Sequence, residues 1–252
     1  MSSLASQLEL ARSAARAAAV VLREEFARGS TVQSSAGKDI KLAADVLAEA
    51  CILKALRAGS PHAVLSEESG ADPGMDRSGL HWVVDPLDGT FNFSRRLPAC
   101  AVSIGLCDGN RPVLGVVYDF LNDAMFSGAV GEGAVCNGVP IHVSGTADRA
   151  SAMICTGFPS GGRYDDASLL GFVRKAQTYK KVRLLGSAAL SLAYVAAGLV
   201  DVYHEEGIYL WDVAAGLALI SAAGGTFEMR PTGDPWKLDV IATNGRIAPD
   251  LD

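Results

Sequence analysis

Runs of basic residues are absent from this 252-residue sequence, in which 28 acidic side chains outnumber 22 basic ones for a formal net charge of −6. Non-specific binding to nucleic acid requires clustered positive charge, so the acidic balance argues against a nucleic-acid partner. Acidic side chains can also serve as metal ligands, because a divalent cation can hold several carboxylates together.

Long hydrophobic runs are lacking as well. The longest, AALSLAYVAAGLV and VAAGLALISAAGG, are too short to cross a bilayer and fit buried helices better. The N-terminal stretch AAAVVL is short and flanked by arginines and glutamates, unlike a secretory signal. The five cysteines form no C-x-x-C pair and are odd in number, which predicts reduced, mostly buried thiols. We therefore expect a cytoplasmic protein without a membrane segment.

Several common catalytic motifs are missing. Without G-x-S-x-G, nothing indicates a Ser-His-Asp hydrolase. Without G-x-x-x-x-G-K-S/T, a P-loop NTPase is not expected. The four histidines do not cluster at metal-ligand spacing; they are His62, His81, His142 and His204.

What is present is enough apolar sequence for a sizeable core, since 49% of the residues are hydrophobic and 20% are charged. Apolar periodicity and turn signals predict the elements. Helices are expected at about 4–28, 39–58, 165–177, 187–198 and 212–225. Strands are expected at 63–68, 80–85, 99–107, 112–120, 124–130, 141–144, 151–158, 181–186, 199–206, 225–229 and 238–244.

The order of these elements predicts a mixed α/β (α+β) fold in two layered halves that form one compact unit. Residues 1–145 read as an α+β half, because short β-prone runs separated by turn signals indicate an antiparallel meander. Residues 146–252 read as an α/β half, because helices and strands alternate there.

The stretch VVDPLDGTFNF at 83–93 places Asp85 and Asp88 at the end of a predicted buried strand. Asp-Pro and Asp-Gly are common in turns, so turn chemistry alone is one interpretation. Other carboxylates follow predicted strands or begin helices, notably Glu67 and Asp212, and Asp45 lies on the second helix. Sites in layered α/β folds gather at such ends. Converging carboxylates would repel one another without a cation, so the pattern indicates a phosphate site with several Mg²⁺ ions.

Four segments, in this order along the chain, resemble signatures of the inositol monophosphatase family. They are LSEES, VVDPLDGTFNF, LGSAALSLAYVAAGLVDVYHE and LWDVAAGLALISAAGG. The resemblance implies a layered αβαβα sandwich of the sugar phosphatase type and a Mg²⁺-dependent, lithium-sensitive phosphatase. It also implies a homodimer with two or three Mg²⁺ ions per subunit.

The resemblance implies metal ligands residue by residue. Glu67, Asp85 and the backbone carbonyl of Leu87 would hold the first Mg²⁺, and Asp85, Asp88 and Asp212 the second. The chemistry expected from such a site is attack of an activated water on a phosphate monoester, without a covalent enzyme intermediate.

It implies catalytic and substrate roles in the same way. Thr90 and Glu67 would orient the attacking water, and Asp45 would support a third, weaker ion together with Glu67. Glu205 would accept substrate hydroxyls, with Glu206 as the alternative if the strand faces the other way. The substrate-binding set is Asp88, Gly89, Thr90, Gly186, Ser187, Ala188, Glu205 and Asp212.

The sequence departs from the family pattern in two places. Lys41-Leu42 stands where the family often has Val-Thr, so a threonine hydroxyl near Asp45 is missing. Phe91 replaces a frequent second threonine after Gly-Thr, which changes the wall of the pocket. The leading hypothesis is hydrolysis of inositol 1-phosphate or a similar small polyol phosphate. The alternatives are fructose-1,6-bisphosphate, histidinol phosphate or 3'-phosphoadenosine 5'-phosphate as substrate, or a phosphate-binding regulatory protein without turnover.

Overall fold

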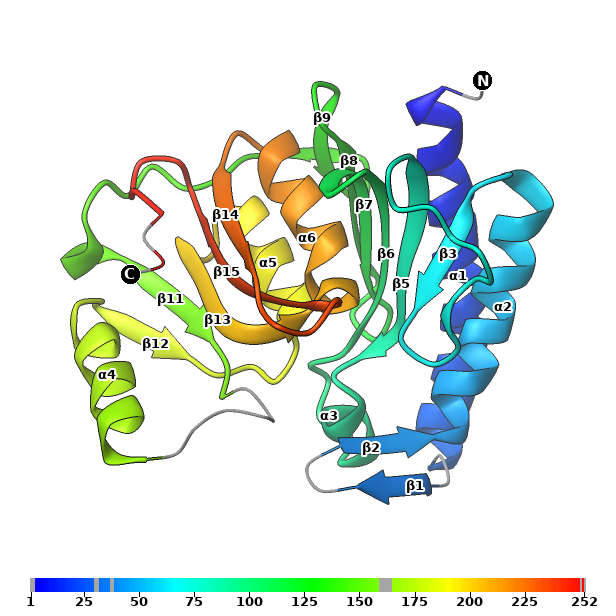
Figure 1. Ribbon diagram of the computed structural model, residues 1–252, viewed down its shortest axis with the longest axis horizontal. Helices are drawn as coiled ribbons and strands as arrows, with labels where there is room; N and C mark the ends of the chain where they lie inside the picture. The colour runs from blue at the N-terminus through cyan, green and yellow to red at the C-terminus, as the bar shows by residue number, and fades with distance from the viewer. Residues whose placement is uncertain (1–2, 30–31, 37–38, 159–164, 250, 252) are drawn as a thin grey trace.

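Helices and sheets alternate in five layers in the computed structural model, which describes residues 3–29, 32–36, 39–158, 165–249 and 251. From right to left in Figure 1, the layers are α1 with α2, an eight-stranded sheet, α5 with α6, a five-stranded sheet, and α4. The predicted layered αβαβα fold is confirmed. The helices are α1 (Leu4–Arg28), α2 (Ala43–Gly59), α3 (Thr90–Ser94), α4 (Asp166–Gln177), α5 (Ala188–Ala196) and α6 (Leu210–Ala222), with a 3₁₀ turn at Arg149–Ser151.

The eight-stranded sheet has the order β10-β9-β8-β7-β6-β5-β3-β4. Its strands from β5 to β10 pair antiparallel in chain order, and this run includes the meander predicted within 99–144. Strand β3 pairs parallel to β5. The strands are β3 (Ala63–Ser66), β4 (Gly70–Ala71), β5 (Leu80–Asp88), β6 (Ala101–Asp108), β7 (Arg111–Asp119), β8 (Ala124–Ala129), β9 (Gly133–Cys136) and β10 (Val139–Ile141).

The five-stranded sheet has the order β12-β11-β13-β15-β14. The central strand β13 is parallel to β11 and antiparallel to β15. Its strands are β11 (Met153–Thr156), β12 (Lys181–Arg183), β13 (Val202–Tyr209), β14 (Thr226–Pro231) and β15 (Lys237–Thr243). A separate hairpin pairs β1 (Val32–Ala36) with β2 (Asp39–Leu42).

Helix α6 lies directly on the eight-stranded sheet because two paired glycines remove the side chains between them. Gly105 of β6 is paired with Gly115 of β7. A Cβ atom on Gly115 would lie 2.0 Å from the carbonyl oxygen of Ala215, and one on Gly105 would lie 3.1 Å from the Ala214 Cβ. Burial of the surrounding apolar side chains, such as Leu217, favours this close approach. The contact brings the start of α6 to the end of β5.

The helix predicted at 39–58 begins four residues later than expected. Residues 39–42 form β2, and α2 starts at Ala43. The Leu42 backbone is extended, and its N–H donates to the Asp45 carboxylate at 2.6 Å. Asp45 therefore stabilises the first turn of the helix, and the preceding residues are left free to pair with β1.

Other boundaries also differ from the predictions. The strand predicted at 141–144 lies at Val139–Ile141, because the chain leaves the sheet and the Val143 N–H donates to the Ala223 carbonyl. Strands β1, β4 and β9 were not predicted. The helix predicted to open at Asp212 begins at Leu210, and Asp212 is the third residue of its first turn. The domain boundary near residue 145 stays a prediction.

The apolar runs form internal helices. Most of α5 and α6 is buried between the two sheets. Among the described residues, no helix combines the length and the apolar character that a bilayer crossing needs.

Candidate metal centre

Three aspartates meet where β5 ends and α6 begins. One carboxylate oxygen from each of Asp85, Asp88 and Asp212 lies within 4.8 Å of the other two. Asp85 and Asp88 are both buried, on an irregular end of β5 where the pairing with β6 shifts register. The Asp85 Oδ1 atom accepts the Leu87 N–H at 2.9 Å, which turns the chain around Pro86. Residues 127 positions apart in sequence therefore converge on one point.

Glu67 joins this group from the neighbouring strand. Strands β3 and β5 are parallel, and the Glu67 N–H extends their ladder by donating to the Val84 carbonyl at 3.0 Å. The Glu67 side chain shares a hydrogen bond with Asp85. Two carboxyl groups can share such a bond only when one of them carries a proton. The predicted ligands Glu67, Asp85, Asp88 and Asp212 thus form one cluster, beside the Leu87 backbone.

Three helices begin beside this cluster. Asp45 lies in the first turn of α2 and Asp212 in the first turn of α6, where each accepts a backbone N–H from the residue before its helix. Asp88 lies against the start of α5, where it accepts the Ala189 N–H at 2.9 Å, the Ala188 N–H at 3.3 Å, and the Ser187 hydroxyl. The positive ends of the helix dipoles offset part of the repulsion between the carboxylates.

The offset is incomplete, because burial and mutual repulsion raise the pKa values of the cluster. Burial, followed by the neighbouring carboxylates, raises the pKa of Asp85 and Asp212 well above the ordinary value. Burial raises the pKa of Glu67 to about 7. For Asp88, burial raises the pKa to about 6 against the opposing hydrogen bonds from α5. The isolated cluster thus retains protons that an ordinary carboxylate would have lost.

This donor set fits a hard divalent cation. It contains only oxygen ligands, and Mg²⁺ prefers carboxylates together with water and phosphate oxygens. Within the described ranges, the ion pairs involve other carboxylates, those of Glu9, Glu24, Glu25, Asp72 and Asp123. A cation that replaced the retained protons would satisfy the cluster better than a single lysine or arginine could.

Thr90 and Asp45 lie together beside the Leu87 carbonyl. The Thr90 hydroxyl is 2.9 Å from the Leu87 oxygen and 3.2 Å from Asp45 Oδ1, and it can donate its proton to either. The other Asp45 oxygen accepts the Leu42 N–H. Both oxygens of Asp45 are therefore occupied by groups of the chain. Its predicted role at a third ion stays a prediction, and its visible role is to cap α2 and to hold Thr90.

The residues predicted beside the substrate lie at the start of α5. Ser187 caps this helix, because its hydroxyl oxygen accepts the Leu190 N–H at 3.2 Å. The same hydroxyl donates to Asp88, so the loop and the carboxylate cluster are joined directly. Gly89, the residue after Asp88, has a positive φ of 88°, and a Cβ there would lie 2.6 Å from the Ala99 oxygen, so only glycine fits.

Sequence reasoning missed Asn92. Its amide nitrogen lies 2.8 Å from the carbonyl oxygens of both Ala99 and Leu185, and 3.2 Å from that of Gly186. Asn92 therefore ties helix α3 to the loop that precedes α5, which lies in the other half of the chain. The signal was present, since Asn92 is the asparagine of the quoted segment VVDPLDGTFNF.

Glu205 and Glu206 point to opposite sides of β13, as alternation along a strand requires. Glu205 shares its side with Tyr203, which packs in the core with α5 and α6. His204, on the other side with Glu206, contacts Lys175 of α4. Glu205 is therefore on the side of the carboxylate cluster, and the Asp88 charge adds to burial in raising the Glu205 pKa to about 7. Glu206 is exposed.

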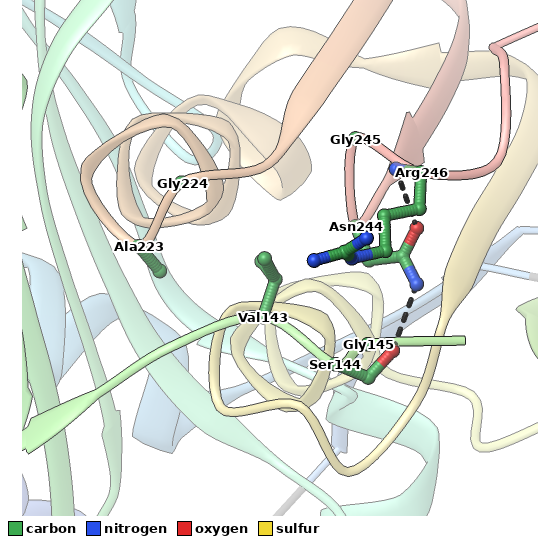
Figure 2. Close-up of a pocket in the computed structure, with 8 residues that line it drawn as sticks. All are labelled: Val143, Ser144, Gly145, Ala223, Gly224, Asn244, Gly245 and Arg246. Carbon is green, nitrogen blue, oxygen red and sulfur yellow. Dashed lines mark hydrogen bonds between the residues drawn. The ribbon is translucent and has the colours of Figure 1, made fainter. Parts of the chain in front are cut away.

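A pocket lies outside this cluster. It has a volume of about 380 Å³ and lies between the end of α6 and the loops around residues 144 and 245. Figure 2 shows Arg246 extending over it towards Val143, with Asn244 hydrogen-bonded to Ser144. None of its lining residues belongs to the predicted site.

Comparisons with known proteins agree with the geometry. The family model described as "Inositol monophosphatase family" matches residues 3–250. The chain is 37% identical over 246 residues to "Nus factor SuhB" of Escherichia coli, covering 95% of this chain and 92% of that protein. It is 36% identical over 260 residues to "Inositol-1-monophosphatase" of Synechocystis, covering 99% of this chain and 88% of that protein.

A solved structure supports the same assignment. The inositol monophosphatase from Anabaena (Nostoc) superposes with a TM-score of 0.82 at 38% identity, covering 96% of this chain and 92% of that one. Sequence and fold therefore agree, and the chain belongs to the inositol monophosphatase family.

Proposed function

We propose that the protein is a Mg²⁺-dependent phosphomonoesterase that hydrolyses inositol 1-phosphate or a similar small polyol phosphate. The observation that carries this proposal is the cluster of Asp85, Asp88 and Asp212, whose carboxylates converge within 4.8 Å at the ends of β5 and α6. Membership of the inositol monophosphatase family supports a phosphatase. Glu67 and the Leu87 carbonyl complete the oxygen ligands that would hold two ions, with a third near Asp45.

Mg²⁺ at these ligands supplies neutralisation of the phosphate ester, a lowered pKa for water, and stabilisation of the departing alkoxide. The chain's own residues orient the reactants. Thr90 donates its hydroxyl proton to Leu87 or Asp45, so its oxygen is free to accept a hydrogen bond from the attacking water. Glu67 lies in the same cluster, beside Asp85, and its carboxylate would take up the proton of the attacking water.

The experiment that tests this proposal measures phosphate release from a panel of substrates with MgCl₂ and with excess EDTA. The panel contains inositol 1-phosphate, fructose-1,6-bisphosphate, histidinol phosphate, 3'-phosphoadenosine 5'-phosphate and p-nitrophenyl phosphate. We expect the largest kcat/KM for inositol 1-phosphate and loss of activity in EDTA. Undiminished turnover in EDTA would refute the metal-dependent mechanism, and a preference for another ester would change the substrate class.

The non-enzymatic alternative is a regulatory protein that binds phosphate without turning it over. Several relatives carry the name "Nus factor SuhB", which states no phosphatase activity. The same panel separates the two hypotheses, because a binding protein would release no phosphate from any of these esters with Mg²⁺ present.

Lithium sensitivity is a further expectation from the family resemblance. We expect Li⁺ at concentrations on the order of millimolar to lower the rate of inositol 1-phosphate hydrolysis. The measurement compares rates in LiCl and NaCl at matched ionic strength, because salt alone screens charged substrates. Equal rates in the two salts would contradict this expectation.

We further propose that the protein is a homodimer and that the outer face of α4 contributes to its interface. None of the described residues of α4 is buried, and Leu169, Leu170 and Val173 are exposed on it. Exposed aliphatic side chains grouped on one helix are typical of an interaction surface.

The proposed interface can be tested through the molar mass of the protein in solution. Leu170→Glu should convert a dimer to a monomer, because it would place a charge in an apolar contact. Light scattering coupled to size exclusion measures the change. Val20→Glu is the matched control, because Val20 is also exposed but lies on α1 in the opposite outer layer. A monomeric wild-type protein, or an unaltered dimer in the Leu170 variant, would contradict the proposal.

The proposed location is the cytoplasm. All five cysteines are free, and Cys100, Cys107 and Cys155 are buried. Reduced, buried thiols are typical of proteins from reducing compartments.

A further inference from the structure

The Glu205 carboxylate is held on two sides by groups without a role in the chemistry proposed above. On one side, the Tyr203 hydroxyl donates to Glu205 Oε2 at 2.9 Å. On the other side lies Gly157. A Cβ atom on Gly157 would be 2.4 Å from Oε2 and 2.5 Å from Oε1 of Glu205. The carboxylate therefore occupies the volume that a side chain at position 157 would need.

The sheet explains this arrangement. Strands β11 and β13 are parallel neighbours, with Thr156 paired to His204, so the next residue on each strand is Gly157 and Glu205. Tyr203 and Glu205 are two residues apart and point to the same side. The pairing of β13 with β15 becomes irregular directly after Glu205, between Glu205 and Ile208. Gly157, Tyr203 and Glu205 are thus brought together by the strand order.

Tyr203 is well suited to hold a carboxylate. Its side chain is 1% exposed, and burial raises its pKa well above the ordinary value, so the hydroxyl keeps its proton and remains a donor. Among the described residues, Tyr203 is the hydrogen-bond donor that the structure gives to Glu205. This bond uses Oε2 and leaves Oε1 available to accept a hydroxyl from a ligand.

We infer that Gly157 and Tyr203 are positioning residues for substrate choice, which hold the Glu205 carboxylate where it accepts hydroxyl groups of a polyol phosphate. The inference rests on the proposed function and deepens it. The enzyme can favour esters that carry hydroxyl groups only if the Glu205 carboxylate is held in a position to accept them. A displaced carboxylate leaves the substrate hydroxyl without a hydrogen-bond partner.

The test compares kcat/KM for inositol 1-phosphate and for p-nitrophenyl phosphate, which carries no ring hydroxyls, in Gly157→Ala, Tyr203→Phe and Glu205→Gln. We expect Glu205→Gln and Gly157→Ala to lower the inositol-to-aryl ratio about tenfold, and Tyr203→Phe a few-fold, on the scale of one charge-assisted hydrogen bond. For Gly157→Ala and Tyr203→Phe, values for the aryl ester should stay within about twofold of wild type.

Gly157→Ala should fold, since Gly157 does not have a positive φ and the atoms that its new methyl group meets are the flexible end of a side chain. Gly171→Ala is the matched control, because a Cβ there meets nothing within 4 Å. Tyr194→Phe is the control for loss of a hydroxyl, since Tyr194 lies on α5 and packs edge-on against Phe126. Both controls should keep the wild-type ratio.

Two readouts separate positioning from a general structural effect. In the Glu205→Gln background, Gly157→Ala should have no further effect on the ratio, because its effect passes through Glu205. Tyr203→Phe should shift the acidic limb of the pH profile to higher pH for inositol 1-phosphate only. Loss of the donor removes a hydrogen bond that favours the charged carboxylate, so the Glu205 pKa rises.

The outcomes distinguish this inference from the proposed function. A wild-type protein that hydrolyses neither ester with Mg²⁺ would overturn the proposed function, and the inference with it. If the protein is active and Glu205→Gln changes the ratio, an unchanged ratio in Gly157→Ala overturns only the positioning role. An unchanged ratio in all three variants of an active enzyme removes Glu205 itself from substrate choice.

Discussion

Asp88→Asn should lower kcat for phosphate release about hundredfold or more and leave the fold intact. Asp88 is one of three carboxylates within 4.8 Å of one another, and asparagine removes one negative charge from that set without changing its shape. The charge that develops on the ester is then less well stabilised. The side-chain oxygen of asparagine can still accept the Ser187 hydroxyl and the Ala189 N–H, so the start of α5 should keep its structure.

The measurement combines steady-state kinetics with calorimetric titration of Mg²⁺ or Mn²⁺ into the variant. Weaker metal binding and lower kcat should appear together, while Tm changes by no more than about 3 °C. Asp119→Asn is the matched control, because Asp119 is also buried but pairs with Asn122 outside the cluster. Near-normal turnover in Asp88→Asn would mean that Asp88 is a turn residue, the alternative that the Asp-Gly sequence left open.

Metal-free protein should lose stability as the pH rises from about 5.5 to 8, and added Mg²⁺ should restore more stability at pH 8 than at pH 5.5. Burial raises the pKa of Glu67 and Asp45 to about 7, that of Asp88 to about 6, and those of Asp85 and Asp212 well above normal. When a carboxyl group has a higher pKa in the folded state than in the unfolded state, the folded state binds more protons at every pH between those two pKa values. The contribution of these carboxyl groups to the free energy of unfolding is present in full below about pH 4 and is lost as the pH rises through about 7.

The readout is the difference between Tm with MgCl₂ and Tm with EDTA at each pH. We expect this difference to be at least about 5 °C larger at pH 8. Other titrating groups, including His204, whose pKa burial lowers to about 4, contribute equally with and without Mg²⁺ and cancel in the difference. Asp85→Asn should raise the Tm of the metal-free protein at pH 8, because it removes a buried negative charge, whereas Asp119→Asn should not. A pH-independent difference would contradict the assignment of this cluster as the metal centre.

Local signals account for the parts of the fold that could be predicted from sequence. Strands β6, β7 and β8 of the meander follow from β-prone runs divided by turn residues, and α5 follows from the Ser187 cap and an apolar run. The start of α2 could not be predicted, because 39–42 are held in β2 by pairing with β1, and the Asp45 carboxylate that begins the helix also contacts Thr90. Strand pairing and side-chain capping compete there, and periodicity alone does not decide between them.

The sequence by itself determined which residues are the candidates for the chemistry. Oxygen ligands for a divalent cation must be carboxylates or carbonyls, and the quoted segments placed Glu67, Asp85, Asp88 and Asp212 at strand ends and helix starts. Only the tertiary structure decided how these groups meet and what holds them. The contact of α6 with Gly105 and Gly115 brings Asp212 to β5, and the start of α5 supplies donors to Asp88. The alignment of β11 with β13 places Gly157 against Glu205, because strand order joins residues that are far apart in the chain.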